Sequence, residues 1–137
     1  MSKERLRAND IRFSSKNPRN FMSKLLQKRR EDKVNLSLAY LTKLYEGQDG
    51  KCAISGIPMT HQHGLGKVHT NISIDRINPQ GKYEEGNVQL VCMIVNRMKW
   101  TMPMPEFLDL CQIITKRQKT DPRTNCADFS GNSRAEV

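Results

Sequence analysis

The sequence has no long apolar run and no closely spaced pair of cysteines. A membrane-spanning helix needs about 18 or more consecutive apolar residues, and no such run occurs, so we expect no membrane span. The opening residues M-S-K-E-R-L-R lack the apolar core of a secretory signal, so we expect a cytoplasmic protein. The four cysteines form no C-x-x-C motif; they are Cys52, Cys92, Cys111 and Cys126.

A structural zinc site usually takes four closely organised ligands, often from C-x-x-C pairs. Cys52 begins C-A-I-S and Cys92 begins C-M-I-V, so neither has a second cysteine three residues later. We therefore expect no structural zinc, unless histidines substitute as ligands. Cys52 and Cys92 are expected to be buried apolar thiols in a reducing compartment.

Acidic side chains are also scarce relative to basic ones. The 137 residues include 23 Lys and Arg against 14 Asp and Glu, a net charge of +9, which predicts attraction to a polyanion such as nucleic acid. Residues 1–33 hold 11 basic and 4 acidic side chains. A solvated helix face would explain this run, but contact with the DNA backbone explains the concentration of charge better. The expected contacts are Arg19, Lys24, Lys28, Arg29 and Arg30.

Local signals divide the chain into three parts. We expect a basic arm and helix at 1–35, a compact domain at 36–118, and a mobile polar tail at 119–137. Asn17-Pro18 and Ser37 are helix starts, and the second helix is expected to end at Gly47. A last helix is expected over 106–116, with an apolar stripe that packs against the core. The stripe consists of Phe107, Leu110, Cys111 and Ile114.

The segment 71–100 contains the most informative pattern. Residues 71–77 alternate apolar and polar side chains, which predicts a half-buried strand. Residues 78–86 are rich in Asn, Pro and Gly, and the apolar run 88–91 predicts a second strand after this loop. From Cys92 the apolar spacing becomes helical. We therefore expect an α+β fold in which a β-hairpin is crossed by a helix and flanked by N-terminal and C-terminal helices.

This order of elements places two polar residues where both could bind one cation. Asp75 lies near the end of the first strand and Asn96 one turn into the helix. If the helix crosses the hairpin, their oxygens can approach one cation, and Mg²⁺ needs only one or two protein oxygens besides water and phosphate. Arg76, Arg97 and Lys99 add positive charge suited to phosphate. The alternative is a surface ion pair between Asp75 and Arg76 and a solvated Asn96.

These residues resemble the ββα-metal core of phage-borne HNH endonucleases. The matching motifs are S-I-D-R-I, G-N-V-Q-L-V and V-N-R-M-K, and the similarity extends over about 36–118. The resemblance implies that Asp75 and Asn96 bind a divalent metal, Mg²⁺ or Mn²⁺. It also implies that Asn87, nine residues before Asn96, holds the hairpin loop through backbone hydrogen bonds and orients the site.

The sequence departs from the family at Arg76, where the usual general-base histidine is missing. A guanidinium stays protonated and cannot accept a proton from water. All three histidines lie just before the first strand, within 60–70, and an imidazole can accept that proton at neutral pH. We expect His61 to be the base, because the sequence around it is similar to related phage sequences. His63 is second, and His69 and Tyr83 are weaker candidates.

The resulting hypothesis is a metal-dependent endonuclease that hydrolyses DNA, with one nick for each active site. Arg76 would contact the phosphate, and the protein would act as a monomer or a homodimer. Two alternatives remain open at this stage. The chain could be a catalytically inactive HNH-like scaffold that binds DNA, or a basic adaptor or inhibitor that binds a protein partner.

Overall fold

A computed structural model describes residues 17–29, 34–121 and 123. The described residues form an α+β structure with four helices and one two-stranded antiparallel sheet. The chain divides into two compact units, residues 1–101 and 102–137. The expected N-terminal arm, Arg30 and the segment from 124 onward lie outside the described residues. Among the described helices none is long and apolar enough to cross a membrane.

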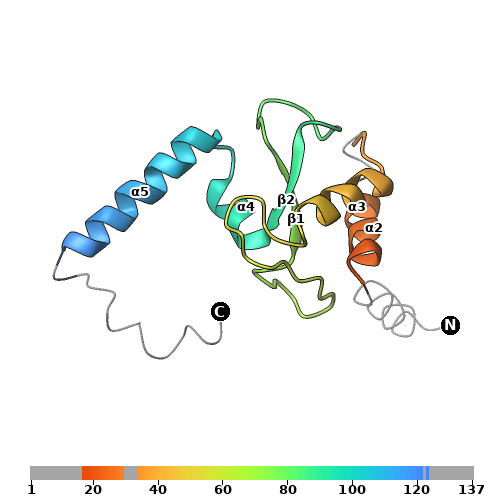
Figure 1. Ribbon diagram of the computed structural model, residues 1–137, viewed down its shortest axis with the longest axis horizontal. Coiled ribbons are helices and arrows are strands. Elements are labelled where there is room, and N and C mark those ends of the chain that lie inside the picture. The colour runs from red at the N-terminus through yellow and green to blue at the C-terminus, as the bar shows by residue number, and fades with distance from the viewer. Residues whose placement is uncertain (1–16, 30–33, 122, 124–137) are drawn as a thin grey trace. The chain divides into compact units, whose positions relative to one another are not determined.

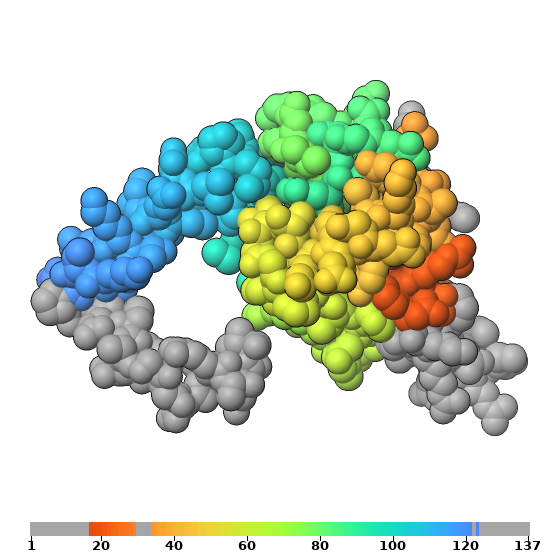
Figure 2. Space-filling model, in the orientation of Figure 1, coloured from red at the N-terminus to blue at the C-terminus, as the bar shows by residue number. Residues whose placement is uncertain are grey.

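Two capped helices precede the hairpin, as the sequence predicts. Helix α2 (Pro18–Lys28) begins after Asn17, whose side chain accepts a hydrogen bond from the Asn20 backbone at 2.9 Å. Helix α3 (Leu38–Gly47) begins after Ser37, which caps it in the same way. The two helices pack against each other, and Figure 2 shows their side chains in contact.

The hairpin consists of β1 (Ile72–Arg76) and β2 (Val88–Cys92), and helix α4 (Met93–Lys99) follows directly. In the ribbon, α4 lies on one side of the hairpin and α2 and α3 on the other (Figure 1). The predicted order of strand, loop, strand and helix is confirmed. The first strand is one residue shorter than expected at each end, the second is one residue longer at its end, and the helix starts one residue later than expected.

The register separates two faces of the hairpin. Residues directly opposite each other in an antiparallel pair point to the same face. Ser73 lies opposite Val91 and Asp75 opposite Gln89, which makes one face largely polar. The other face carries the buried pairs Ile72 with Cys92 and Ile74 with Leu90. Buried apolar side chains therefore lie on both faces of the sheet, since Val91 is also fully buried, but Ser73, Asp75 and Gln89 share one face.

The segment after α3 covers the outer edge of β2. Gln48 donates a hydrogen bond from Nε2 to the Leu90 carbonyl at 2.8 Å and accepts one from the Leu90 N–H at 3.1 Å. The Ala53 N–H also donates to the Leu90 carbonyl. These contacts satisfy backbone groups that an edge strand would leave unpaired.

Cys52 and Cys92 are buried thiols, as expected, and Cys92 lies on the face of the hairpin that carries Ile72. The Ile57 carbonyl accepts hydrogen bonds from the Cys52 N–H at 2.9 Å and from the Cys92 thiol at 4.0 Å, which places the two residues together. Burial raises the pKa of Cys92 to about 11, and the neighbouring Cys52 adds to this effect. Burial alone would also raise the pKa of Cys52, but hydrogen bonds from Ser55 and nearby N–H groups lower it below its ordinary value.

The last helix, α5 (Met104–Thr120), is longer than the expected 106–116 and belongs to the second unit. Phe107 is buried, but Leu110 and Ile114 are 42% and 54% exposed. The expectation that the whole apolar stripe packs against the core is therefore wrong for these two residues. The helix also continues past Lys119, where the tail was expected to begin.

Replacement of Gln48 by Ala should destabilise the protein by about 1–3 kcal/mol, because it leaves the Leu90 N–H without its hydrogen-bond acceptor. Urea unfolding followed by circular dichroism measures the change. Gln80→Ala is the matched control, since Gln80 is exposed and only its backbone N–H takes part in a described hydrogen bond. Equal stability of the two variants would contradict this account of Gln48.

Candidate active site

The carboxylate of Asp75 is buried between β1 and α4 and uses both oxygens. Oδ1 accepts a hydrogen bond from Lys99 Nζ at 3.1 Å, and Oδ2 accepts one from Gln89 Nε2 at 2.9 Å. Only 3% of Asp75 is exposed. Each oxygen retains further lone-pair capacity, because an ionised carboxylate has about four acceptor positions.

Lys99 is the most deeply buried polar residue of this region, with no exposed surface. Its ammonium also donates to the backbone carbonyl of Arg76 at 3.1 Å, so it has two fixed acceptors. A buried charge requires such pairing, since its desolvation is costly. This corrects the expectation that Lys99 contacts a DNA phosphate: its ammonium faces the protein interior and neutralises Asp75.

Asn96 lies one turn before Lys99 on the same side of α4. Its Nδ2 donates to Ser73 Oγ at 2.7 Å and to the Ile74 carbonyl at 3.3 Å. Its Oδ1 accepts no hydrogen bond from the described residues. Since Ser73 and Asp75 alternate onto the same face of β1, Asn96 and Asp75 both belong to the layer between β1 and α4. Each has its own partner there: Asn96 binds Ser73, and Asp75 binds Lys99.

Asn87 makes the loop contacts that the HNH resemblance implies for this position. Its Oδ1 accepts from the Asn78 N–H at 2.9 Å, and its Nδ2 donates to the carbonyls of Asn78 at 3.2 Å and Lys82 at 2.9 Å. A Cβ at Gly81 would lie 2.6 Å from Asn87 Nδ2, so any larger residue would displace this amide. Asn87 thus fixes both sides of the loop between the strands.

Arg76 lies against this loop. Its Nη1 donates to the Gly81 carbonyl at 3.1 Å, and its guanidinium is 5.0 Å from the centroid of the Tyr83 ring. The guanidinium of Arg29, just after α2, is 4.6 Å from the same centroid. Cation–π contacts of this kind stabilise both partners. Through its contacts with Arg29 and Arg76, the Tyr83 ring connects the end of α2 to the loop between the strands.

Asn71 anchors the segment that contains His61. It accepts hydrogen bonds from Thr60 Oγ1 at 2.8 Å and from the Gln62 N–H at 2.9 Å, and it donates to the Gln62 carbonyl. These contacts lie on both sides of His61 in sequence. The Nδ1 atom of His61 is buried and has no hydrogen-bond partner among the described residues.

The other two histidines have different surroundings. His63 lines a cavity of about 380 Å³ together with Lys28 and Ser73, the residue that binds Asn96. The side chain of His69 is exposed, while its carbonyl accepts a hydrogen bond from the Ile94 N–H. His63 is thus connected to the layer between β1 and α4 through Ser73, a link that sequence order alone does not indicate.

The remaining basic candidates differ in exposure. Arg19, Lys28 and Arg97 are exposed, Lys24 and Arg29 are half-buried, and Arg30 lies outside the described residues. The exposed side chains of α2 can therefore reach a phosphate backbone. Arg29 is engaged with Tyr83, so its expected contribution to DNA contact is reduced.

Sequence reasoning missed several residues of the site. Gln89 binds Asp75 and Ser73 binds Asn96. Ser73 alternates onto the same face of β1 as Asp75, which was a signal in the sequence, whereas Gln89 lies opposite Asp75 through the register of the two strands. Trp100 ends α4 with a φ of 51° and is 76% exposed. A large exposed aromatic side chain in a left-handed conformation, directly after the site helix, offers a surface on which a base can stack.

Within the described part of the chain, no three His, Cys, Asp or Glu side chains converge in a way that could hold a metal ion. The candidate donors are instead one carboxylate and one amide. No protein-family model matches the chain, and the curated proteins and solved structures also contain no match to it.

Substitution of Lys99 by Met should destabilise the protein by about 3–5 kcal/mol, because it leaves the buried Asp75 carboxylate without a counter-charge. Chemical denaturation measures the loss. Arg97→Met is the matched control on the exposed side of the same helix and should cost about 0.5 kcal/mol or less. The double variant Lys99→Met/Asp75→Leu should recover most of the stability, and a double variant as unstable as Lys99→Met would contradict the ion-pair account.

Proposed function

We propose that the protein is a metal-dependent DNA endonuclease of the HNH type that cleaves one strand per active site. The observation that carries the proposal is the placement of Asp75 and Asn96 in one layer between the hairpin and the crossing helix. Asn87 adds support, since it binds the hairpin loop as the middle residue of an HNH motif would. The sequence motifs and these contacts both support a role for Asp75, Asn87 and Asn96 in the proposed site.

The donor chemistry fits a hard divalent cation. Asn96 uses its amide nitrogen for Ser73 and Ile74, which leaves Oδ1 for a cation. Asp75 retains lone-pair capacity beside its two hydrogen bonds. One carboxylate and one amide oxygen match the small protein share of a Mg²⁺ or Mn²⁺ site. When bound, such an ion supplies electrostatic stabilisation to the phosphate and to the leaving oxygen.

The chain itself would bind and orient the DNA. The exposed basic side chains of α2, Arg19 and Lys28, lie on the same unit as the site and attract phosphates. Lys28 and His63 line one cavity that also contains Ser73, so a phosphate held by Lys28 would lie near the layer that contains Asn96. Arg97 adds positive charge from the exposed side of α4.

Proton transfer from water requires a base other than Arg76. The buried Nδ1 of His61 has no partner within residues 17–29, 34–121 and 123, so in this part of the chain the imidazole has an unused acceptor or donor atom. His63 lines the cavity beside Ser73. The proposal therefore keeps His61 and His63 as the two candidates for the base. Tyr83 is disfavoured because its ring is stacked against Arg29 and Arg76.

The Asn96→Ala variant should nick supercoiled plasmid in Mg²⁺ or Mn²⁺ at least about a hundredfold more slowly than wild type, since it removes one proposed ligand. Asp75→Asn should also lose activity. The matched controls Asn35→Ala and Asp49→Asn alter exposed residues and should leave the nicking rate unchanged. Full activity of Asn96→Ala, with an unchanged metal requirement, would reject its proposed role.

The base should be revealed by His61→Gln and His63→Gln, one of which should lower the nicking rate on the order of 10²-fold while DNA binding stays near normal. A gel-shift titration at constant salt measures that binding. His69→Gln is the control, because its side chain is exposed. If both His61→Gln and His63→Gln cut at the wild-type rate, neither histidine is the base.

A second candidate function is DNA binding without cleavage. The observation that favours it is the ion pair between Asp75 and Lys99, because the ammonium already neutralises the carboxylate that a metal would need. The same plasmid assay separates the two functions. Wild-type protein that shifts the plasmid on a gel but leaves it intact would replace the nuclease proposal with this one. Protein that neither shifts nor cuts DNA would favour the adaptor alternative.

A further inference from the structure

One side of α5 carries an exposed apolar surface between two opposite charges. Glu106, Leu110, Ile113 and Arg117 are spaced by four, three and four residues, so they follow one another along one row of the helix surface. Leu110 is 42% exposed and Ile113 is 64% exposed. Ile114, adjacent to this row, is 54% exposed. We name these five residues the α5 row.

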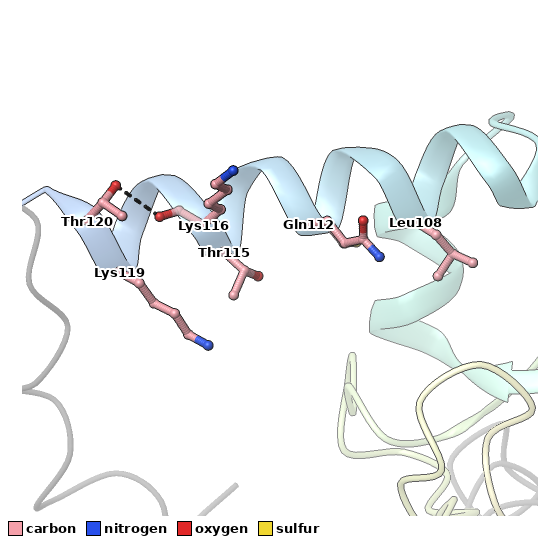
Figure 3. Close-up of a pocket in the computed structure, with 7 residues that line it drawn as sticks. Leu108, Gln112, Thr115, Lys116, Lys119 and Thr120 are labelled. Carbon is pink, nitrogen blue, oxygen red and sulfur yellow. Dashed lines mark hydrogen bonds between the residues drawn. The ribbon is translucent and has the colours of Figure 1, made fainter.

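Three of the four large apolar side chains exposed on α5 belong to this row, namely Leu110, Ile113 and Ile114. Figure 3 shows Leu108, Gln112, Thr115 and Lys119 along another side of α5, where three of the four side chains are polar. Lys116 and Thr120 are connected by a hydrogen bond from Thr120 Oγ1 to the Lys116 carbonyl at 3.1 Å. Leu108 thus lies apart from the patch that Leu110, Ile113 and Ile114 form.

The α5 row is complementary to itself when a second copy runs in the opposite direction. In that arrangement Glu106 of each copy meets Arg117 of the other, and Leu110 of each copy meets Ile113 of the other. A parallel arrangement would instead oppose Glu106 with Glu106 and Arg117 with Arg117, and like charges repel. The charge order thus selects one orientation, and the apolar centre supplies the burial.

We propose that α5 mediates homodimerisation by antiparallel pairing of its α5 row with that of a second copy. This arrangement has two-fold symmetry and uses the same surface on both subunits. Arg117 forms an ion pair with Asp121 of the same chain at 3.3 Å. Because its guanidinium has five N–H donors, it can bind Glu106 of the second copy at the same time. The contact area of a single helix pair is small, so dimerisation is expected at the weak end of specific association.

Sedimentation equilibrium of the full chain tests the proposal. Wild-type protein should show a reversible, concentration-dependent monomer–dimer equilibrium, and Ile113→Glu should weaken dimerisation at least about tenfold, because it places a charge in the apolar centre. Leu108→Glu is the matched control, with similar chemistry on another side of the same helix, and should leave the equilibrium unchanged. A wild-type protein that stays monomeric up to about 1 mM, where a dimer of even millimolar affinity would be populated, would overturn the proposal.

A charge exchange tests the orientation. Glu106→Arg and Arg117→Glu should each weaken dimerisation, and the double variant should restore it, because the antiparallel pairs are then reversed rather than lost. Circular dichroism checks that α5 remains helical. A double variant as weak as the single ones, or equal effects of Leu108→Glu and Ile113→Glu, would overturn the antiparallel pairing. These measurements need neither DNA nor metal, so their outcome is independent of the nuclease proposal.

Discussion

The buried ion pair between Asp75 and Lys99 is the interaction on which the site depends. It joins the end of β1 to the end of α4 across 24 residues of sequence, and both partners are almost completely removed from water. Such a pair is stable only when its geometry and additional hydrogen bonds compensate for desolvation. Gln89 supplies one of these bonds to Asp75, and the Arg76 carbonyl accepts another from Lys99. The position of α4 on the hairpin, and with it that of Asn96, follows from these contacts.

The same pair defines the electrostatics of the proposed chemistry. A divalent cation bound to Asp75 would lie near the ammonium of Lys99. The two positive charges would repel each other, because little water is present between β1 and α4 to screen them. Lys99 therefore opposes metal binding at Asp75, while it also preserves the position of the carboxylate. The neutral Asn96 has no such competitor, and its free oxygen is the more accessible donor of the two. This balance is the reason that cleavage and DNA binding alone are both proposed as candidate functions.

Two asparagines give the irregular segments around β1 a fixed shape. Asn71 binds the backbone of Gln62 and the hydroxyl of Thr60, on either side of His61, and Asn87 binds the backbone of the hairpin loop at Asn78 and Lys82. In each case one amide side chain both donates to and accepts from peptide groups, as a neighbouring strand would. The segment around His61 and the loop between the strands are thereby held close to the hairpin without regular secondary structure.

The sequence by itself determined the elements that depend on local signals. The caps at Asn17 and Ser37, the two strands and the crossing helix follow from turn residues and apolar periodicity within a few residues, and all were predictable. Only the tertiary structure decided that Lys99 is buried rather than exposed to DNA, and that Arg76 lies against Tyr83. It also left much of the α5 stripe uncovered. These outcomes depend on which distant segments of the chain pack against each other. Residue spacing and composition within one segment do not specify these long-range contacts.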